Sequence, residues 1–441
     1  MGLNNRFDRD SAVNHRANGL SIAHWRQRLL QEINLDDLAA LGMAQRRARM
    51  EKVVGHILSR EGPVLSPGER TTLIRRIVDE ALGLGVLEPL LADPSITEIM
   101  VNGPDDIYVE RGGRLTRIDA VFASENQLYQ TIDRIVAQVN RRVDESSPMV
   151  DARLPGGERV NVIVPPLSLT GPVLTIRRFP RPYRMDELVA LGSLDEAGAA
   201  LLAAFVRARL NIVITGGTGT GKTTFLNALS GCIPQEERVI TIEDSAELQL
   251  QQEHVIRLES RPPNIEGQGA VVIRDLVRNA LRMRPDRVII GEVRGAETLD
   301  MLQAMNTGHD GSLVTVHANS AGDAIYRLET LASMSEVKIP YETIRDQIHN
   351  ALDVIVHVDR GADGSRRVAE IATVASGRRQ EVRLSSVMWF RPDPLGLDKV
   401  VRGAFHRAPL PDELSARLVL AGEAVPPEFT VPSAHLAEEV K

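Results

Sequence analysis

The sequence predicts a doubly wound α/β domain in its second half and a smaller α+β domain before it. From about residue 188 onward, short apolar runs alternate with helical patterns, which is typical of a parallel sheet covered by helices. Between residues 96 and 179, short alternating apolar runs surround one amphipathic helix, which indicates an α+β arrangement. The length of 441 residues allows two or three domains of roughly 150 residues each.

The composition excludes several classes of protein. The chain has 52 basic and 59 acidic residues, a balance that disfavours a sequence-independent nucleic-acid coat. The single cysteine, Cys232, excludes a disulfide framework and a multi-cysteine zinc ribbon. No apolar run reaches the roughly 18–20 residues of a membrane span, and residues 1–16 lack the apolar core of a secretory signal. We therefore expect a cytoplasmic protein without a transmembrane segment.

The first half divides into three expected parts. Residues 1–70 are polar and rich in arginine, and we expect a helical or mobile arm. Residues 71–180 form the expected α+β domain. Pro180 and Pro182 then interrupt the pattern, which predicts a linker over residues 181–187.

Residues 188–420 form the expected α/β domain, and its strands are short apolar runs. These runs are Ile212–Ile214, Val239–Ile242, Val288–Ile290, Leu313–Val316 and Val354–Val358. The last segment, residues 421–441, has three prolines and few large apolar residues, so we expect a loosely ordered tail.

A glycine-rich segment follows the first of these runs and fits the phosphate-loop pattern G-x-x-x-x-G-K-[ST]. Its glycines let backbone N–H groups turn toward phosphate oxygens, and the next helix points its positive end at the same place. Lys222 is expected to reach the β- and γ-phosphates, and the Thr223 hydroxyl to ligate Mg²⁺. The expected nucleotide-binding residues here are Gly216, Gly217, Thr218, Gly219, Thr220, Gly221, Lys222, Thr223 and Thr224.

Acidic residues and a histidine follow three further strands. Glu243 and Asp244 end one run, Glu292 follows the next, and His317 follows the third. In open α/β sheets, ligands bind at the carboxyl ends of the strands, so these side chains are expected near the phosphates. A carboxylate there can hold Mg²⁺ through water, a role open to Glu243, or orient the attacking water. Gly291 stands where the second strand usually carries an acid, which favours Glu292 as the residue that activates water.

Four blocks of the sequence together resemble the type II/IV secretion ATPases, and within them the Tad/CpaF branch, over about residues 70–410. The resemblance implies a RecA-like ATPase domain that hydrolyses ATP with Mg²⁺. The blocks are the phosphate loop Gly216–Thr223, the acidic box Thr241–Leu248, the atypical Walker B segment Arg284–Arg294 and the histidine box Thr307–Asn319.

A fifth block, Val150–Asn161, resembles the arginine-bearing hairpin of this branch. The resemblance implies that Arg153 and Arg159 contact the terminal phosphates, where a guanidinium can stabilise the charge of phosphoryl transfer. A solvated turn is the alternative. Arg177 and Arg178 are weaker candidates for nucleotide contact.

The histidine box adds His309 and His317 as candidate site residues. By the resemblance they sense the γ-phosphate or couple neighbouring subunits, and coupling is favoured over base catalysis because a glutamate is available as the base. His254, His349 and His357 lack such a context, and we expect them to be structural.

The resemblance also implies a hexameric ring, since heterologous contacts close naturally into rings. Such a ring would associate peripherally with the inner membrane through platform proteins and drive transport of pilins or other substrates by motion about the linker. Two alternatives remain open from the sequence: a DNA translocase or helicase, and a nucleotide-gated scaffold that does not hydrolyse rapidly. Net charge and scarce aromatic residues argue against the first, and the set of Lys222, Glu243 and Glu292 against the second.

Overall fold

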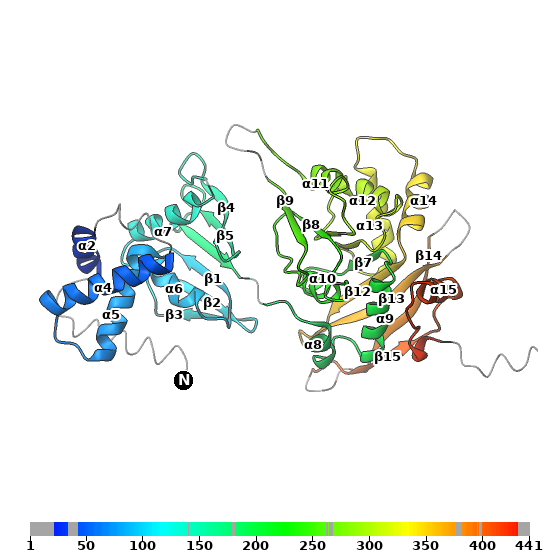
Figure 1. Cartoon of the computed structure of the whole chain (residues 1–441), viewed down its shortest axis with the longest axis horizontal. Helices are drawn as coiled ribbons and strands as arrows, with labels where there is room; N and C mark the ends of the chain where they lie inside the picture. Colours follow the sequence, from blue (N-terminus) through cyan, green and yellow to red (C-terminus); the bar gives the residue numbers. More distant parts are fainter. Residues whose placement is uncertain are drawn as a thin grey trace, which may run out of the picture. The chain divides into compact units, whose positions relative to one another are not determined.

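The computed structural model divides the chain into two compact units, residues 1–180 and 181–441 (Figure 1). We call them the N-terminal and C-terminal units. The structure describes residues 22–33, 43–139, 141–178, 181–261, 263, 268–375, 382–394, 396 and 399–430. Parts of the expected arm and tail, including residues 1–21 and 431–441, lie outside the described residues. Among the helices described, none is both long and apolar enough to cross a membrane.

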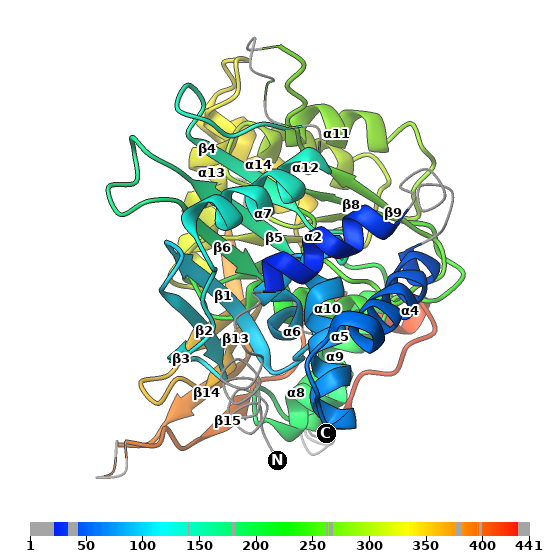
Figure 2. The same ribbon diagram turned by 90° about the vertical axis from the view of Figure 1, so that its left-hand side faces the viewer.

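The N-terminal unit begins with three helices that share a core (Figure 2). They are α2 (Ile22–Glu32), α4 (Met43–Glu61) and α5 (Pro67–Leu82). Trp25, Met50 and Ile77, one from each helix, are almost fully buried. The boundary expected at residue 70 therefore falls inside α5, which packs against the helices of the expected arm. A capping box formed by Ser66 and Glu69 fixes the start of α5.

A six-stranded antiparallel sheet follows, in the order β3-β2-β1-β6-β5-β4. The apolar side chains of one face pack on α7, whose Leu128, Ile132 and Ile135 are fully buried. The elements are η1 (Gly85–Leu87), α6 (Glu88–Leu91), β1 (Ile96–Asn102), β2 (Ile107–Arg111), β3 (Arg114–Ile118), α7 (Glu125–Ala137), β4 (Met149–Arg153), β5 (Arg159–Ile163) and β6 (Val173–Arg177).

The C-terminal unit is built on a nine-stranded sheet in the order β15-β14-β13-β12-β7-β11-β10-β8-β9. The strands from β12 to β9 in this order are parallel, whereas β13, β14 and β15 continue the sheet antiparallel. The strands are β7 (Ile212–Thr215), β8 (Val239–Glu243), β9 (Val255–Glu259), β10 (Arg287–Ile290), β11 (Leu313–Val316), β12 (Val354–Arg360), β13 (Arg366–Ala375), β14 (Arg383–Pro392) and β15 (Gly403–Arg407). The sheet is thus larger than the five strands expected.

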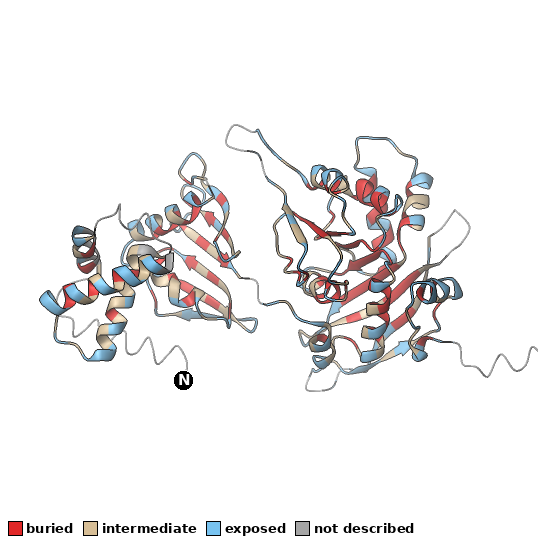
Figure 3. Cartoon of the chain, in the orientation of Figure 1, coloured by how far each residue is buried: buried red, intermediate tan, exposed pale blue. Residues whose placement is uncertain are grey.

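Helices cover both faces of this sheet, so it is doubly wound. Along β7, Ile212 and Ile214 belong to the core that contains α9 and α10, and Val213 belongs to the opposite core with α11 to α14. The central strands are buried over their whole length (Figure 3). The helices are α8 (Met185–Ala190), α9 (Glu196–Arg207), α10 (Lys222–Ser230), α11 (Ile273–Ala280), α12 (Glu297–Met305), α13 (Ala321–Ser333), α14 (Tyr341–Ala351), α15 (Asp412–Leu420) and η2 (Pro427–Phe429).

Two boundaries in this unit differ from the sequence-based expectation. Helix α8 begins at Met185, inside the segment expected as a linker. The segment expected as a loose tail contains Phe429, whose side chain is fully buried and whose carbonyl accepts the Leu410 N–H at 2.8 Å. The buried ring of Phe429, together with Val425, packs residues 425–429 on the core, although the segment is rich in proline.

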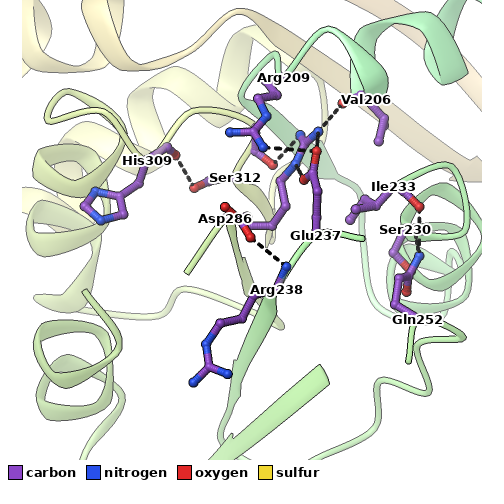
Figure 4. Close-up of polar contacts among 12 residues, drawn as sticks. Val206, Arg209, Ser230, Ile233, Glu237, Arg238, Gln252, Asp286, His309 and Ser312 are labelled. Atoms are coloured by element: carbon purple, nitrogen blue, oxygen red, sulfur yellow. Dashed lines mark hydrogen bonds and ion pairs between the residues drawn. The ribbon is translucent and has the colours of Figure 1, made fainter. Parts of the chain in front are cut away.

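A buried ion pair lies at the amino edge of the parallel sheet, by which we mean the side where its parallel strands begin. Arg287, the first residue of β10, has no exposed side-chain surface and pairs through Nε with Glu237. It also donates to the carbonyls of Val206 at 2.8 Å and Gly311 at 3.2 Å. Glu237 also pairs with Arg209 at 3.2 Å, and Figure 4 shows these two side chains meeting near Val206. The buried guanidinium is therefore matched by one carboxylate and two carbonyls.

Candidate nucleotide-binding site

The glycine-rich segment connects β7 to α10 at the carboxyl edge of the sheet, and its backbone requires glycine. Gly219 and Gly221 have φ of +74° and +94°, a region that other residues rarely adopt. A Cβ on Gly216 would lie 2.4 Å from the Val358 carbonyl oxygen of the neighbouring β12. The loop is therefore closely packed against β12 and is followed directly by α10, a helix of nine residues that begins at Lys222. This is the geometry in which backbone N–H groups and a helix N-terminus bind an anion.

The Lys222 ammonium lies over this loop and contacts His317. Its Nζ donates to the carbonyls of Gly216 at 2.9 Å and Gly217 at 2.8 Å, and lies 3.2 Å from Nδ1 of His317. Burial lowers the pKa of Lys222, while the nearby Glu292 acts in the opposite direction. Since a charged lysine only donates, Nδ1 must accept and the proton of a neutral His317 resides on Nε2. Burial also lowers the pKa of His317, which favours this neutral form.

The row of polar contacts continues to Glu292 and beyond. Nε2 of His317 lies 3.0 Å from Oε1 of Glu292, and the Arg294 guanidinium donates to Oε2 of Glu292 at 2.9 Å. Arg294 also lies 3.7 Å from Asp244, and its hydrogen bond to Glu292 is the first cause of its raised pKa. The ends of β7, β8, β10 and β11 therefore bring their polar residues into one connected row, which we call the carboxyl-edge row. Arg294 is the last residue of the Walker B segment, and it was not predicted as a site residue.

Glu243 does not belong to this row, contrary to its expected role as a catalytic or Mg²⁺-holding group. Its side chain is 3% exposed, and Oε2 accepts the N–H groups of Glu247 at 2.7 Å and Leu248 at 3.0 Å. Oε1 is buried without a partner among the described residues. Burial raises the pKa of Glu243 to about 7. A Cβ on Gly291 would lie 2.8 Å from Cγ of Glu243, so the glycine makes room for the buried carboxyl group.

His309 also lies away from the phosphate loop of its own chain, which differs from the expectation of a γ-phosphate contact. It precedes β11, whereas His317 follows it, so the two occupy opposite edges of the parallel sheet. Figure 4 shows His309 in the same region as Arg209 and Asp286, which precede β7 and β10. A strand of four residues spans roughly 13 Å, too far for a direct contact.

Three of the four candidate arginines lie in one row across the sheet of the N-terminal unit. Arg153 pairs in register with Arg159, and Arg159 with Arg177, on neighbouring strands. Paired residues project from the same face, so the three arginines form a basic stripe. Arg178 differs, because its guanidinium donates to the carbonyl oxygens of Asp93 and Ile96 in its own unit. It is a structural residue in this fold.

Comparison with known proteins gives the family of the chain. The sequence profile described as Type II/IV secretion system protein matches residues 80–384. The chain belongs to this family. A Mycobacterium tuberculosis protein named for conjugal transfer is 41% identical over 319 residues, covering 70% of this chain and 90% of its own length. The type IV secretion system protein PtlH of Bordetella pertussis is 36% identical, covering 65% and 93% respectively.

A solved structure supports the fold of the chain. A crystal structure of the pilus retraction motor PilT with bound ADP has a TM-score of 0.51 and 21% identity, and the match covers 67% of this chain and 84% of that one. This likeness supports the RecA-like arrangement predicted from the sequence. Together with the phosphate loop and the carboxyl-edge row, membership of the type II/IV secretion family identifies the chain as a secretion-system ATPase.

Proposed function

We propose that this secretion-system ATPase is a motor of the Tad/CpaF branch, which converts ATP hydrolysis into the transport of pilins or other substrates. The branch is supported by the motif blocks of the sequence, and hydrolysis is supported by the connection of Lys222 through His317 to Glu292 at the end of three adjacent strands. A phosphate-binding lysine and a candidate water-activating carboxylate thus share one neutral imidazole. That arrangement suits hydrolysis rather than binding alone.

Each residue of the carboxyl-edge row has a proposed task. The loop N–H groups and Lys222 bind the phosphates, and Glu292 orients and deprotonates the attacking water. His317, which donates from Nε2, orients the Glu292 carboxylate. Arg294 holds the other oxygen of Glu292 and thereby limits its rotation.

The residues present fit a nucleotide with Mg²⁺. Among the described residues no group of three or more His, Cys, Asp or Glu side chains could hold a metal ion by itself. Thr223, the second residue of α10, would therefore share the ion with phosphate oxygens. The ion would neutralise phosphate charge. Asp244, an exposed acid of the row that directly follows β8, is proposed to contact the ion through water.

We further propose a hexameric ring in the cytoplasm, attached peripherally to the inner membrane through platform proteins, without direct nucleic-acid binding. In such a ring the stripe of Arg153, Arg159 and Arg177 would add positive charge at the terminal phosphates. His309, at the opposite sheet edge from the loop, would act between subunits rather than on the nucleotide of its own chain. Movement of the two units about the segment before α8 would follow the γ-phosphate.

The test uses the full chain and the variant Glu292→Gln, with Glu342→Gln on the exposed start of α14 as the matched control. We expect the wild type and the control to hydrolyse ATP and to restore pilus assembly or secretion in a deletion strain, whereas Glu292→Gln binds ATP without doing either. Electron microscopy with a non-hydrolysed ATP analogue tests the ring. If Glu292→Gln hydrolysed ATP at the wild-type rate and its strain secreted normally, the proposed motor mechanism would be refuted. Stimulation of wild-type turnover by DNA would favour a translocase.

A further inference from the structure

The two sides of the phosphate loop are built differently. Strand β7, which leads into the loop, has β11 as one neighbour and β12 as the other. The residues placed at the reacting phosphate, His317 and Glu292, follow β11 and β10 and therefore lie on one side. On the other side β12 continues past the end of β7 and turns back as β13, with the hairpin connection between residues 360 and 366.

This hairpin contacts the loop directly. Nε of Arg366 donates to the carbonyl of Gly219 at 2.9 Å, and a Cβ on Gly221 would lie 3.1 Å from Cδ of the same arginine. The Val358 carbonyl of β12 fills the space next to Gly216. Three of the loop's glycines are therefore contacted by one hairpin, and the arginine side chain occupies the space that only a glycine leaves open.

The backbone at Arg366 is fixed by a second element. Its carbonyl oxygen accepts the Ser193 hydroxyl at 2.8 Å, and the Val368 N–H donates to the Ser193 carbonyl at 2.7 Å. Ser193 lies between α8 and α9, so the backbone that directly follows the Arg366 side chain is anchored to this connection. Such an anchored residue can hold the loop in one conformation.

A second arginine of the hairpin, Arg360, is available for a ligand. It is exposed, and its guanidinium makes no hydrogen bond or ion pair with the described residues. Its Nη1 would lie 3.9 Å from a Cβ on Gly219, and Nη2 lies 3.8 Å from the corresponding position on Gly364. The guanidinium is thus beside the loop, on the side away from Glu292.

We propose that the β12–β13 hairpin forms the nucleoside side of the ATP site, with Arg366 as a positioning residue for the loop and Arg360 as a contact to the α-phosphate and ribose. A triphosphate whose terminal phosphate faces β11 and β10 must direct its nucleoside toward β12 and β13. The hairpin's cations lie where the phosphate chain leaves the loop, and charge-assisted bonds to phosphate are strong. This inference rests on the proposed ATPase function and extends it to residues outside the family's motif blocks.

The proposal predicts a distinct kinetic signature. ATP and ADP share the nucleoside and the first two phosphates, so a change at the nucleoside side affects their binding equally. A change at the reacting phosphate affects turnover instead. Loss of either arginine is therefore expected to raise KM while kcat at saturating ATP remains within about twofold.

The experiment measures ADP and ATPγS dissociation constants by calorimetry, and steady-state turnover, for Arg366→Ala, Arg360→Ala and Arg366→Lys. Arg383→Ala, an exposed arginine of β14 in the same sheet, is the matched control. We expect both alanine variants to raise both dissociation constants by the same factor of about 5–20, equivalent to about one hydrogen bond to a charged group. Lysine at 366 retains a donor for the Gly219 carbonyl and is expected to recover most of the affinity.

The outcomes separate the inference from the proposed function. Unchanged dissociation constants in Arg366→Ala and Arg360→Ala, with a wild type that binds and hydrolyses ATP, would overturn the inference alone. A fall in kcat with unchanged ADP binding would place the hairpin at the reacting phosphate and equally overturn it. No ATP binding by the wild type would instead reject the proposed function. If Arg366→Ala unfolds early in a thermal melt, Arg360→Ala decides, because the Arg360 side chain is exposed and its guanidinium makes no hydrogen bond or ion pair with the described residues.

Discussion

Charged residues are buried at both the amino and the carboxyl edge of the C-terminal sheet, but their polar partners differ between the two edges. At the amino edge, Arg287 donates to Glu237 and to two backbone carbonyls. At the carboxyl edge, Lys222 and Glu243 are buried with pKa values shifted toward their neutral forms, and Glu243 leaves one oxygen without a partner among the described residues. A buried charge with a full set of partners supports the fold, whereas the displaced pKa values lie at the edge where we propose that the chemistry takes place.

The largest expected effect tests the carboxyl edge. Glu292→Gln removes the proposed base, and we expect kcat to fall by roughly 10²–10⁴-fold, the usual contribution of a general base. ADP affinity is expected to stay unchanged, because Glu292 is proposed to act at the terminal phosphate, which ADP lacks. Turnover is followed by phosphate release and binding by calorimetry. Equal losses in kcat and ADP affinity would mean that Glu292 has a structural role like that of Glu237.

The amino edge is tested through stability. Glu237→Ala leaves the Arg287 guanidinium buried without its carboxylate, and we expect the free energy of unfolding to fall by about 3–5 kcal/mol. Urea denaturation followed by Trp389 fluorescence, in a Trp25→Phe background, reports on the C-terminal unit, because each unit contains one tryptophan.

The turnover of the folded fraction should remain unchanged in Glu237→Ala. Replacing both partners, with Arg287→Met and Glu237→Leu, is expected to recover much of the lost stability because no buried charge is left unpaired. If Glu237→Ala kept the wild-type stability but lost turnover, the amino edge would serve catalysis rather than stability, and the two edges would no longer differ in role.

Glu243 predicts a pH dependence of smaller size. Its pKa rises from 4.5 to about 7 on folding, so the folded protein retains this proton where the unfolded chain has lost it. The stability contribution is therefore present below pH 4.5 and is lost as the pH rises to about 7, by roughly 3 kcal/mol at most. Glu243→Gln should flatten this part of the stability profile, measured by urea denaturation at each pH. If the free energy of unfolding of Glu243→Gln changed with pH in the same way as that of the wild type, Glu243 would not be the source of this pH dependence.

The smallest effect is expected at the surface. Arg207 pairs with Glu423 at 2.6 Å, with side chains 44% and 18% exposed. Glu423→Gln should lower the free energy of unfolding by less than about 1 kcal/mol, as is usual for such pairs. A loss similar to that of Glu237→Ala would show that exposure does not distinguish the two ion pairs.

Much of the C-terminal unit could be predicted from the sequence, because its parallel strands are continuous apolar runs such as Ile212–Ile214. Strands β9 and β13 to β15 were missed, since charged residues such as Arg257, Arg366 and Arg391 break the apolar pattern. The pairing of β13 depends on β12, which is distant from the phosphate loop in sequence and beside it in space. No local pattern indicates that Arg366 contacts Gly219.

The positions of the candidate residues could be predicted from the ends of the strands, whereas the directions of their side chains could not. The ends of the strands place Lys222, Glu292 and His317 together, as the sequence order of their strands indicated. Glu243 follows the same rule of position, yet its side chain turns inward to two backbone N–H groups. His309 stands in the same motif as His317, but the intervening strand carries it to the opposite edge.

Position 291 is a glycine, and this has a consequence for how related chains can vary at this position. Because a Cβ there would lie 2.8 Å from Cγ of Glu243, the two positions compete for a single volume. A relative with an acidic residue at the position of Gly291 should therefore have a shorter residue at the position of Glu243. The two sites are expected to exchange as a pair, so that one carboxylate, from either strand, occupies the space between the ends of β8 and β10.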